Sequence, residues 1–181
     1  GTADRGRRLK SDGATTNPRR DTNVMSDISV SASFAINQYS LSYSAEANGS
    51  VTGSTSQTVN HGADGTPVEA LPDTGYHFVE WSDGVTSNPR TDTSVNTDVT
   101  VSAAFAINQY HLSYSADANG SISGSTSQTV NYATDAESVT AVPAAGYRFV
   151  QWSDGSTENP RTDTNVSADL AVSASFALGQ Y

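Results

Sequence analysis

The sequence contains no cysteine, which excludes a disulfide framework and a cysteine-based zinc site. Lysine is nearly absent too, since Lys10 is the only one in the chain. Covalent isopeptide cross-links need a lysine, so they are excluded from the residues after position 10. No apolar run approaches the length that spans a membrane, so no membrane span is predicted. The sequence carries no signal peptide, and we expect any secretion signal to lie upstream of Gly1.

Basic residues are also scarce, except at the N-terminal end. The formal net charge of the 181 residues is −10, and beyond residue 20 the chain is strongly acidic. An acidic surface repels the phosphate backbone, so nucleic acid is not expected as a partner. We interpret residues 1–10 as a leader or basic arm. The first twenty residues hold most of the cations: Arg5, Arg7, Arg8, Lys10, Arg19 and Arg20.

The chain is built from an internal repeat. A segment that begins at Tyr39 starts again at Tyr110, and 110 − 39 = 71. The two copies align without an insertion, and roughly two-thirds of their positions are identical. The same register continues upstream, where Ser11-Asp12-Gly13 and Phe34 match residues of the whole copies. The predicted domains are a leader or basic arm at 1–10, the C-terminal half of a repeat at 11–38, repeat 1 at 39–109 and repeat 2 at 110–181.

The composition of each repeat favours strands and turns. Ser, Thr, Asn and Gly are abundant and Leu is rare, which is poor material for helices. Asn48-Gly49 predicts a hairpin that returns the first strand. The last strand alternates from Val99 to Ile107 and runs into Tyr110 without a Gly or Pro linker, so we expect modules joined stiffly in an elongated array. The predicted strands of repeat 1 cover residues 39–43, 50–52, 57–59, 68–72, 76–81 and 99–107.

Both tryptophans lie at the same place in the two copies, in the runs Gly75–Gly84 and Gly146–Gly155. Trp81 follows Phe78 by three positions, which breaks the alternation of a strand. A bulge near Glu80 would return the indole to the face of Phe78. An indole buries a large apolar area, so we predict that it fills the core. The alternative is an exposed aromatic strip on which sugar rings stack.

We predict no catalytic, cofactor-binding or metal site. A repeated acid–base or metal site needs the same residue in each copy, and the histidines do not meet this condition. No G-x-S-x-G elbow is present either. The histidines and their counterparts are His61 with Tyr132, His77 with Arg148, and His111 with Ser40.

Three aspartates of each repeat recur and allow two interpretations. Calcium would need several of their oxygens gathered at one place, but the sequence has no D-x-D-x-D-G loop. Otherwise Asp83 belongs to a Ser-Asp-Gly turn, Asp92 occupies an outward strand position, and Asp98 begins the last strand. We favour these structural roles. The counterparts are Asp154, Asp163 and Asp169 in repeat 2, and Asp12, Asp21 and Asp27 upstream.

The order of motifs is specific enough to indicate a family. It runs Y-x-L-x-Y, N-G, Q-T-V-N, a strand that ends in Pro, G-Y-x-F-x-x-W and a final V-x-A-x-F strand. This order resembles the divergent internalin-type B repeats, which are related to the Listeria–Bacteroides repeat of bacterial surface proteins. The resemblance covers residues 39–180 fully and 11–38 in part. Many relatives have Gly before the Trp, where this chain has Glu80 or Gln151.

The resemblance implies compact, mostly β modules related to the β-grasp arrangement, in tandem on secreted or surface-anchored proteins. We therefore expect a structural or adhesive repeat segment of a bacterial extracellular protein, acting as a stalk, spacer or filament, and no enzyme. The alternative is a carbohydrate-binding accessory module of a secreted enzyme. Residues 11–38 lack the first hairpin and the Tyr-Phe-Trp strand, which leaves their alternating apolar residues without a cover. Two arrangements would cover them: packing onto the following repeat through the Phe34–Leu41 connection, or head-to-tail strand addition to another chain.

Overall fold

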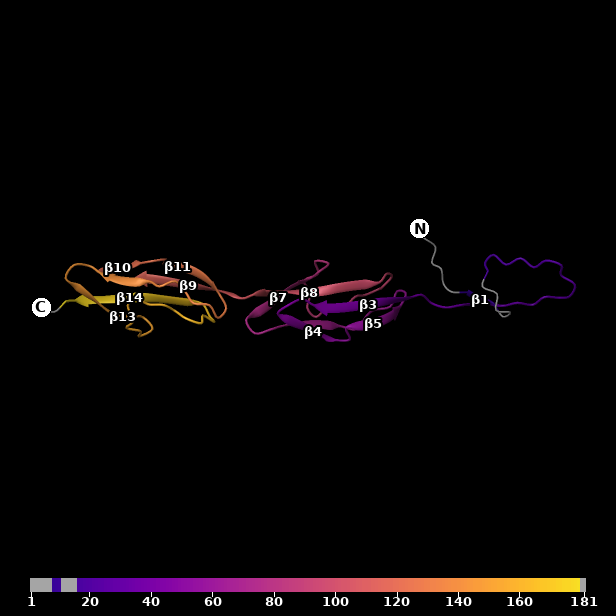
Figure 1. Ribbon diagram of the computed structural model, residues 1–181, viewed down its shortest axis with the longest axis horizontal. Helices are drawn as coiled ribbons and strands as arrows, with labels where there is room; N and C mark the ends of the chain where they lie inside the picture. Colours follow the sequence, from indigo (N-terminus) through magenta and orange to yellow (C-terminus); the bar gives the residue numbers. More distant parts are fainter. Residues whose placement is uncertain (1–7, 11–15, 180–181) are drawn as a thin grey trace. The chain divides into compact units, whose positions relative to one another are not determined.

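The computed structural model describes residues 8–10 and 16–179, and side-chain burial from residue 16 onward. Within these residues the fold consists of strands and loops without a helix, which confirms the mostly β prediction (Figure 1). The N-terminal half contains β1 (Arg8–Lys10), β2 (Ala32–Phe34), β3 (Gln38–Ala45), β4 (Gly49–Gly53), β5 (Ser56–Asn60), β6 (Val68–Pro72), β7 (Tyr76–Trp81) and β8 (Val99–Ile107). Repeat 2 contains β9 (Gln109–Ala116), β10 (Gly120–Ser123), β11 (Ser127–Asn131), β12 (Thr140–Pro143), β13 (Tyr147–Trp152) and β14 (Leu170–Leu178).

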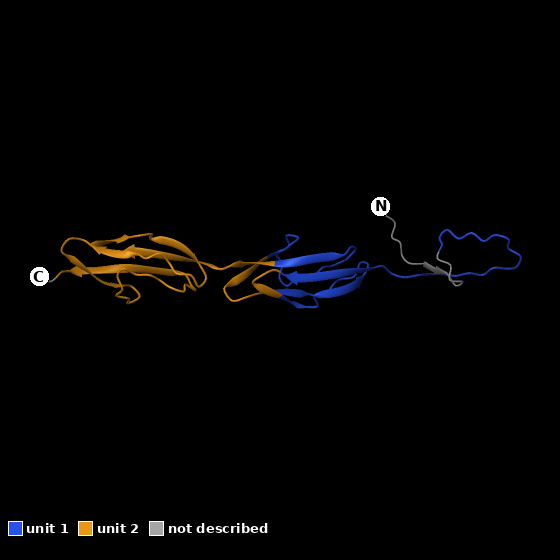
Figure 2. Cartoon of the chain, in the orientation of Figure 1, with its two compact units in different colours: residues 1–45, 51–70, 80–103 blue, residues 46–50, 71–79, 104–181 orange. Residues whose placement is uncertain are grey.

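The chain divides into two compact units, coloured separately in Figure 2. One unit holds the described residues of 1–45, 51–70 and 80–103. The other holds 46–50, 71–79 and the described residues of 104–181. The second unit therefore contains all of the described part of repeat 2 together with the end of repeat 1 that leads into it.

Each repeat forms a four-stranded sheet and a two-stranded sheet. The larger sheets have the orders β5-β3-β8-β7 and β11-β9-β14-β13, and the smaller ones are β4-β6 and β10-β12. The first and last strands of a repeat are parallel neighbours in the middle of the larger sheet. In repeat 2 this central parallel pair is flanked by antiparallel neighbours, β11 beside β9 and β13 beside β14. The relation to the β-grasp arrangement stays an implication of the family resemblance.

The core of repeat 2 lies between its two sheets, and Trp152 is fully buried in it. The pairing of β13 with β14 shifts register between Phe149 and Gln151, so Val150 is an extra residue. This bulge returns Trp152 to the core face, opposite Ala174, as predicted. The indole of repeat 1, Trp81, is fully buried as well. The prediction of a core tryptophan is therefore confirmed, and neither indole offers a surface on which a sugar could stack.

The hairpin predicted at Asn48-Gly49 is wrong in its pairing. Strand β4 pairs with β6, whereas the neighbours of β3 are β5 and β8. Asn48 does adopt the left-handed conformation, with φ of 74°. The glycine is needed for packing instead, because a Cβ on Gly49 would lie 2.5 Å from the Cζ atom of Phe105. Asn48-Gly49 is a local signal for a turn, whereas tertiary contacts decide which strand pairs with β4.

The half-repeat finds a strand partner in the predicted leader. β2 is only three residues long, shorter than the alternation from Ile28 to Ile36 indicated, and it pairs antiparallel with β1. The pairs Lys10–Ala32 and Leu9–Ser33 match Trp152–Ala174 and Gln151–Ser175 after a shift of 142 residues, twice the repeat length. Residues 8–10 therefore occupy the place of the missing Tyr-Phe-Trp strand.

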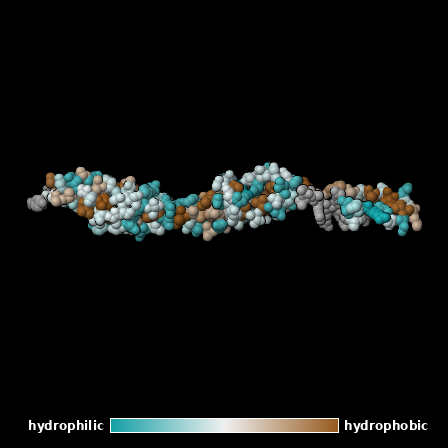
Figure 3. Space-filling model, turned by 90° about the horizontal axis from the view of Figure 1, so that it is seen from above, coloured by the Kyte–Doolittle hydropathy of each residue, from teal (hydrophilic) through white to brown (hydrophobic). Residues whose placement is uncertain are grey.

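Large apolar side chains of the half-repeat remain exposed, and Figure 3 shows apolar residues at the surface of this segment. The counterparts of five of them in repeat 1 are buried or half-buried, whereas Met25 corresponds to the exposed Asn96. Among its described residues, the half-repeat has no strands equivalent to β3 and β6. Head-to-tail association through this segment stays a prediction. No helix in the described part of the chain is long and apolar enough to cross a membrane. The exposed residues are Val24, Met25, Ile28, Val30, Phe34 and Ile36.

We expect Trp152→Ala to unfold repeat 2 and leave repeat 1 folded. Truncating a buried tryptophan costs about 3–5 kcal/mol, which is about all that a core of this size supplies. Repeats that contact only their neighbours keep such damage local. The fluorescence of Trp81 during a urea titration should then report an unchanged transition of repeat 1. Two folded repeats in the variant would contradict the core role of the indole.

Candidate functional site

An arginine is buried at the centre of each repeat. The side chain of Arg90 is only 5% exposed, and its guanidinium lies 5.7 Å from the ring centroid of Trp81. Its Nη1 and Nη2 donate to the two carboxylate oxygens of Asp83, both at 2.8 Å. Its Nε and Nη2 donate to Asp92 at 2.9 and 2.6 Å. The Tyr43 hydroxyl donates to the same Asp92 at 2.6 Å, which completes the network that we call the arginine clamp.

Repeat 2 contains the same clamp around Arg161. Its Nη1 lies 2.8 Å from a carboxylate oxygen of Asp154, and its Nε and Nη2 donate to Asp163 at 2.9 and 2.6 Å. Tyr114 donates to Asp163 at 2.7 Å, and the guanidinium lies 5.4 Å from the ring centroid of Trp152. The half-repeat keeps one side of the clamp, where Arg19 donates to Asp21 at 2.8 Å.

The clamp was missed by the sequence analysis, which placed Asp92 outward. That placement is wrong, because the Asp92 side chain is only 17% exposed and faces Arg90. Two of the three aspartates weighed as calcium ligands thus converge on a guanidinium. The third, Asp98, accepts a hydrogen bond from the backbone N–H of Ser40 at 2.8 Å. The signal that could have identified the clamp was the spacing Arg-x-Asp, which recurs in all three copies of an otherwise arginine-poor sequence.

The clamp fixes the charges of its members. Hydrogen bonds from Arg90, with a smaller one from Tyr43, hold the pKa of Asp92 below its usual value in spite of burial. Burial and the contact with Asp92 raise the pKa of Tyr43. Its carboxylate partners raise the pKa of Arg90. At neutral pH the acids are ionised, the arginine is charged and the tyrosine is protonated, as in a structural ion pair.

A second cluster lies where repeat 1 leads into repeat 2, entirely within the second unit. Asn108 separates β8 from β9, and its N–H donates to the Gly75 carbonyl at 2.8 Å. Its carbonyl accepts the N–H of Tyr132 at 2.8 Å, and its Oδ1 lies 2.8 Å from Nδ1 of His77. Gly75 has φ of +84°, and a Cβ there would overlap the Tyr132 ring. We call these four residues the junction cluster.

Residues 39–109 and 110–180 each match the Divergent InlB B-repeat domain family. The chain belongs to this family. The resemblance to internalin-type B repeats is thereby confirmed, and B-repeats of this kind are typical of bacterial surface proteins. No curated protein and no solved structure matches the chain.

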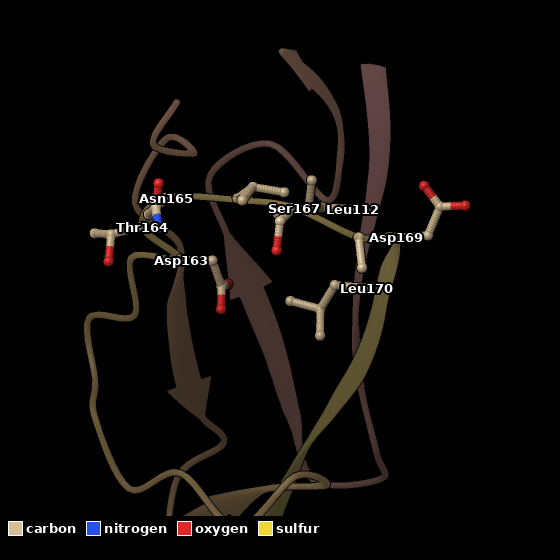
Figure 4. A pocket seen from close by; sticks show the side chains of 9 residues that line it. Leu112, Asp163, Thr164, Asn165, Ser167, Asp169 and Leu170 are labelled. Atoms are coloured by element: carbon tan, nitrogen blue, oxygen red, sulfur yellow. The ribbon is translucent and has the colours of Figure 1, made fainter. Parts of the chain in front are cut away.

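The second B-repeat carries a depression of about 250 Å³ between β9 and the loop of residues 163–170. Figure 4 shows its side chains, with those of Asp163 and Leu170 turned toward the interior. The carboxylate of Asp163 is already bound by Arg161 and Tyr114. Ligand pockets usually exceed about 300 Å³ and present free polar groups. This depression is smaller than that, and the carboxylate of Asp163 is already engaged within the clamp.

The histidines of the B-repeats lie with separate partners. The Tyr39 hydroxyl lies 3.3 Å from Nδ1 of His61. His77 belongs to the junction cluster, and Nε2 of His111 lies 3.4 Å from the Ser127 hydroxyl. Each histidine is thus paired within its own surroundings, and the structure does not bring the three together.

Replacing Asp92 by Asn should lower the free energy of unfolding by about 3 kcal/mol at pH 7, because it removes one partner of a buried charge. The native pKa of Asp92 lies below that of the unfolded chain, so its contribution is present above about pH 4 and lost as the pH falls further. The variant should therefore lose less stability on acidification than the parent chain. Urea titrations at several pH values would measure both effects.

The matched control is Asp83→Asn, whose side chain is 39% exposed and screened by solvent. It should cost less than Asp92→Asn. Equal losses, or an unchanged acid dependence in the Asp92 variant, would contradict the clamp as the source of the stability.

The junction cluster is tested by comparing Gly75→Ala with Gly146→Ala. The two glycines have φ of +84° and +82°, so alanine meets the same backbone strain at each position. Only Gly75 abuts a ring, since a Cβ on Gly146 would meet nothing within 4 Å. Gly75→Ala should therefore cost about 1–3 kcal/mol more by overpacking against Tyr132. Urea unfolding followed by fluorescence would measure this, and the difference should vanish in a Tyr132→Ala background.

Proposed function

We propose that this chain is a structural spacer segment of a bacterial surface or extracellular protein, with no catalytic activity of its own. The observation that carries this proposal is the junction cluster. Both peptide groups of Asn108 are hydrogen-bonded, one to each repeat, and the strands on either side follow without a flexible linker. A connection held in this way should limit bending of the chain at Asn108.

The construction of the B-repeats supports the spacer role. Each repeat buries its own indole and closes its own arginine clamp, so its stability does not depend on a ligand. The ionisable groups most deeply buried pair with one another, which leaves them committed to the fold. The strong negative charge of the repeats opposes close approach of neighbouring copies and favours solubility.

The carbohydrate-binding alternative loses its main support. It needed exposed tryptophans as a stacking platform, and Trp81 and Trp152 are both fully buried. An adhesive role would then belong to other surfaces than the aromatic strip considered from the sequence. We therefore favour the spacer over the binding module.

The proposal is tested by the distribution of distances between the two repeats. The absence of cysteine allows spin labels on Ser56→Cys and Ser127→Cys, exposed residues at equivalent positions of the two repeats. A spacer with a held junction should give one narrow distribution by electron–electron double resonance. Tyr132→Ala should broaden it, because the contact with Gly75 is lost.

The control pair is Ser127→Cys with Ala145→Cys, two exposed positions inside repeat 2. The width of the distance distribution for this pair is the width expected between two labels within one folded repeat. A distribution between the repeats much broader than this control, in the otherwise unmodified chain, would overturn the spacer proposal.

A further inference from the structure

We infer that each B-repeat is a mechanical element that resists tension applied between its two ends. The inference deepens the proposed spacer function and rests on it, because a spacer at a cell surface is pulled at its ends. It is carried by the position of the two strands through which the chain enters and leaves a repeat.

In repeat 2 the chain enters through β9 and leaves through β14, and these strands are parallel neighbours. Leu112 lies opposite Leu170, and Ala116 lies opposite Ala174. The entry at Gln109 and the exit at Leu178 are therefore at opposite ends of the ladder. Tension between them slides the two strands past each other along their own length.

This direction of loading decides how the hydrogen bonds fail. The bonds of a parallel ladder are evenly spaced between the strands. When the strands slide, all of the bonds in the ladder are strained together and must break nearly at once. If both strands were pulled from the same end, the bonds would open one after another under a smaller force. Forced unfolding follows the unfolding rate, so the first geometry should be the more resistant.

Side chains reinforce the same pair of strands. At the start of the ladder Asp169 accepts the N–H of His111 at 2.8 Å. Further along, the Ser115 hydroxyl donates to the Val172 carbonyl at 3.4 Å. The inner side of the pair is anchored in the core by four buried residues: Leu112, Tyr114, Val172 and Ala174.

Repeat 1 has the same construction. Leu41 lies opposite Val99 and Ala45 lies opposite Ala103, again in parallel. Ser40 donates its N–H to Asp98 at 2.8 Å, as His111 does to Asp169. In the described part of the half-repeat, β2 pairs only with the antiparallel β1. The two whole repeats are thus the elements expected to resist tension.

The test is single-molecule force spectroscopy on the full chain in two pulling geometries. Gln109→Cys with Leu178→Cys loads the ladder along its length, and Gln109→Cys with Ala168→Cys pulls both strands from the same end. All three positions are exposed, and the chain offers no other thiol. At one loading rate the first pair should rupture at a force at least about twofold higher, because the bonds share the load.

The event is identified by its length. Between positions 109 and 178 lie 178 − 109 = 69 residue steps, which extend to about 230–250 Å at 3.3–3.6 Å per residue. Fluorescence of Trp152 shows beforehand that each variant is folded. Asp169→Ala should lower the rupture force of the first pair and leave that of the second pair nearly unchanged.

Equal rupture forces in the two geometries, or a lower force in the first, would overturn the inference. Such a result would leave the spacer proposal standing, since that proposal depends on the distance distribution between the repeats. A broad distribution with a high rupture force would overturn the spacer proposal instead. The two experiments can therefore contradict the spacer proposal and the mechanical inference independently of each other.

Discussion

The buried guanidinium is the group on which each module depends. A charge removed from water is costly unless it is paired and hydrogen-bonded. For Arg90 the partners come from separate segments: Tyr43 on the first strand, Asp83 after β7, and Asp92 beyond the cis Asn88-Pro89 bond. The clamp is complete only when these segments meet. This makes the repeat a cooperative unit although its apolar core is small.

The same bulge and loop hold the buried tryptophan and the buried arginine of a repeat in contact. The bulge at Val150 returns Trp152 to the core, where Arg161 lies against its ring. The indole N–H donates to the Glu158 carbonyl at 2.9 Å, which ties it to the loop that carries the clamp. Apolar burial and charge pairing therefore stabilise the same conformation. The polar groups of the clamp are thus committed to the fold, which agrees with the spacer role that we propose.

The first and last strands of each repeat are the part of the fold on which the proposed function depends. The chain enters and leaves each repeat through adjacent parallel strands, and Asn108 joins the last strand of one repeat to the first of the next. Membership of the Divergent InlB B-repeat domain family accounts for the tandem pattern. The parallel pair is the feature from which we infer that such modules, placed in series, resist unfolding under load.

The sequence alone determined which segments of the two whole repeats are strands, where the indole packs and where the bulge occurs, because alternation and a three-residue offset are local patterns. It also identified the family, from the order of its motifs. Only the tertiary structure decided that β4 pairs with β6, that residues 8–10 pair with the last strand of the half-repeat, and that Asp92 faces inward. These features depend on partners far apart in the chain, such as Tyr43 and Asp92, 49 residues apart. Alternation along a strand predicts which residues share a face of the sheet. Which strands become neighbours depends on packing and on the pairing of buried charges.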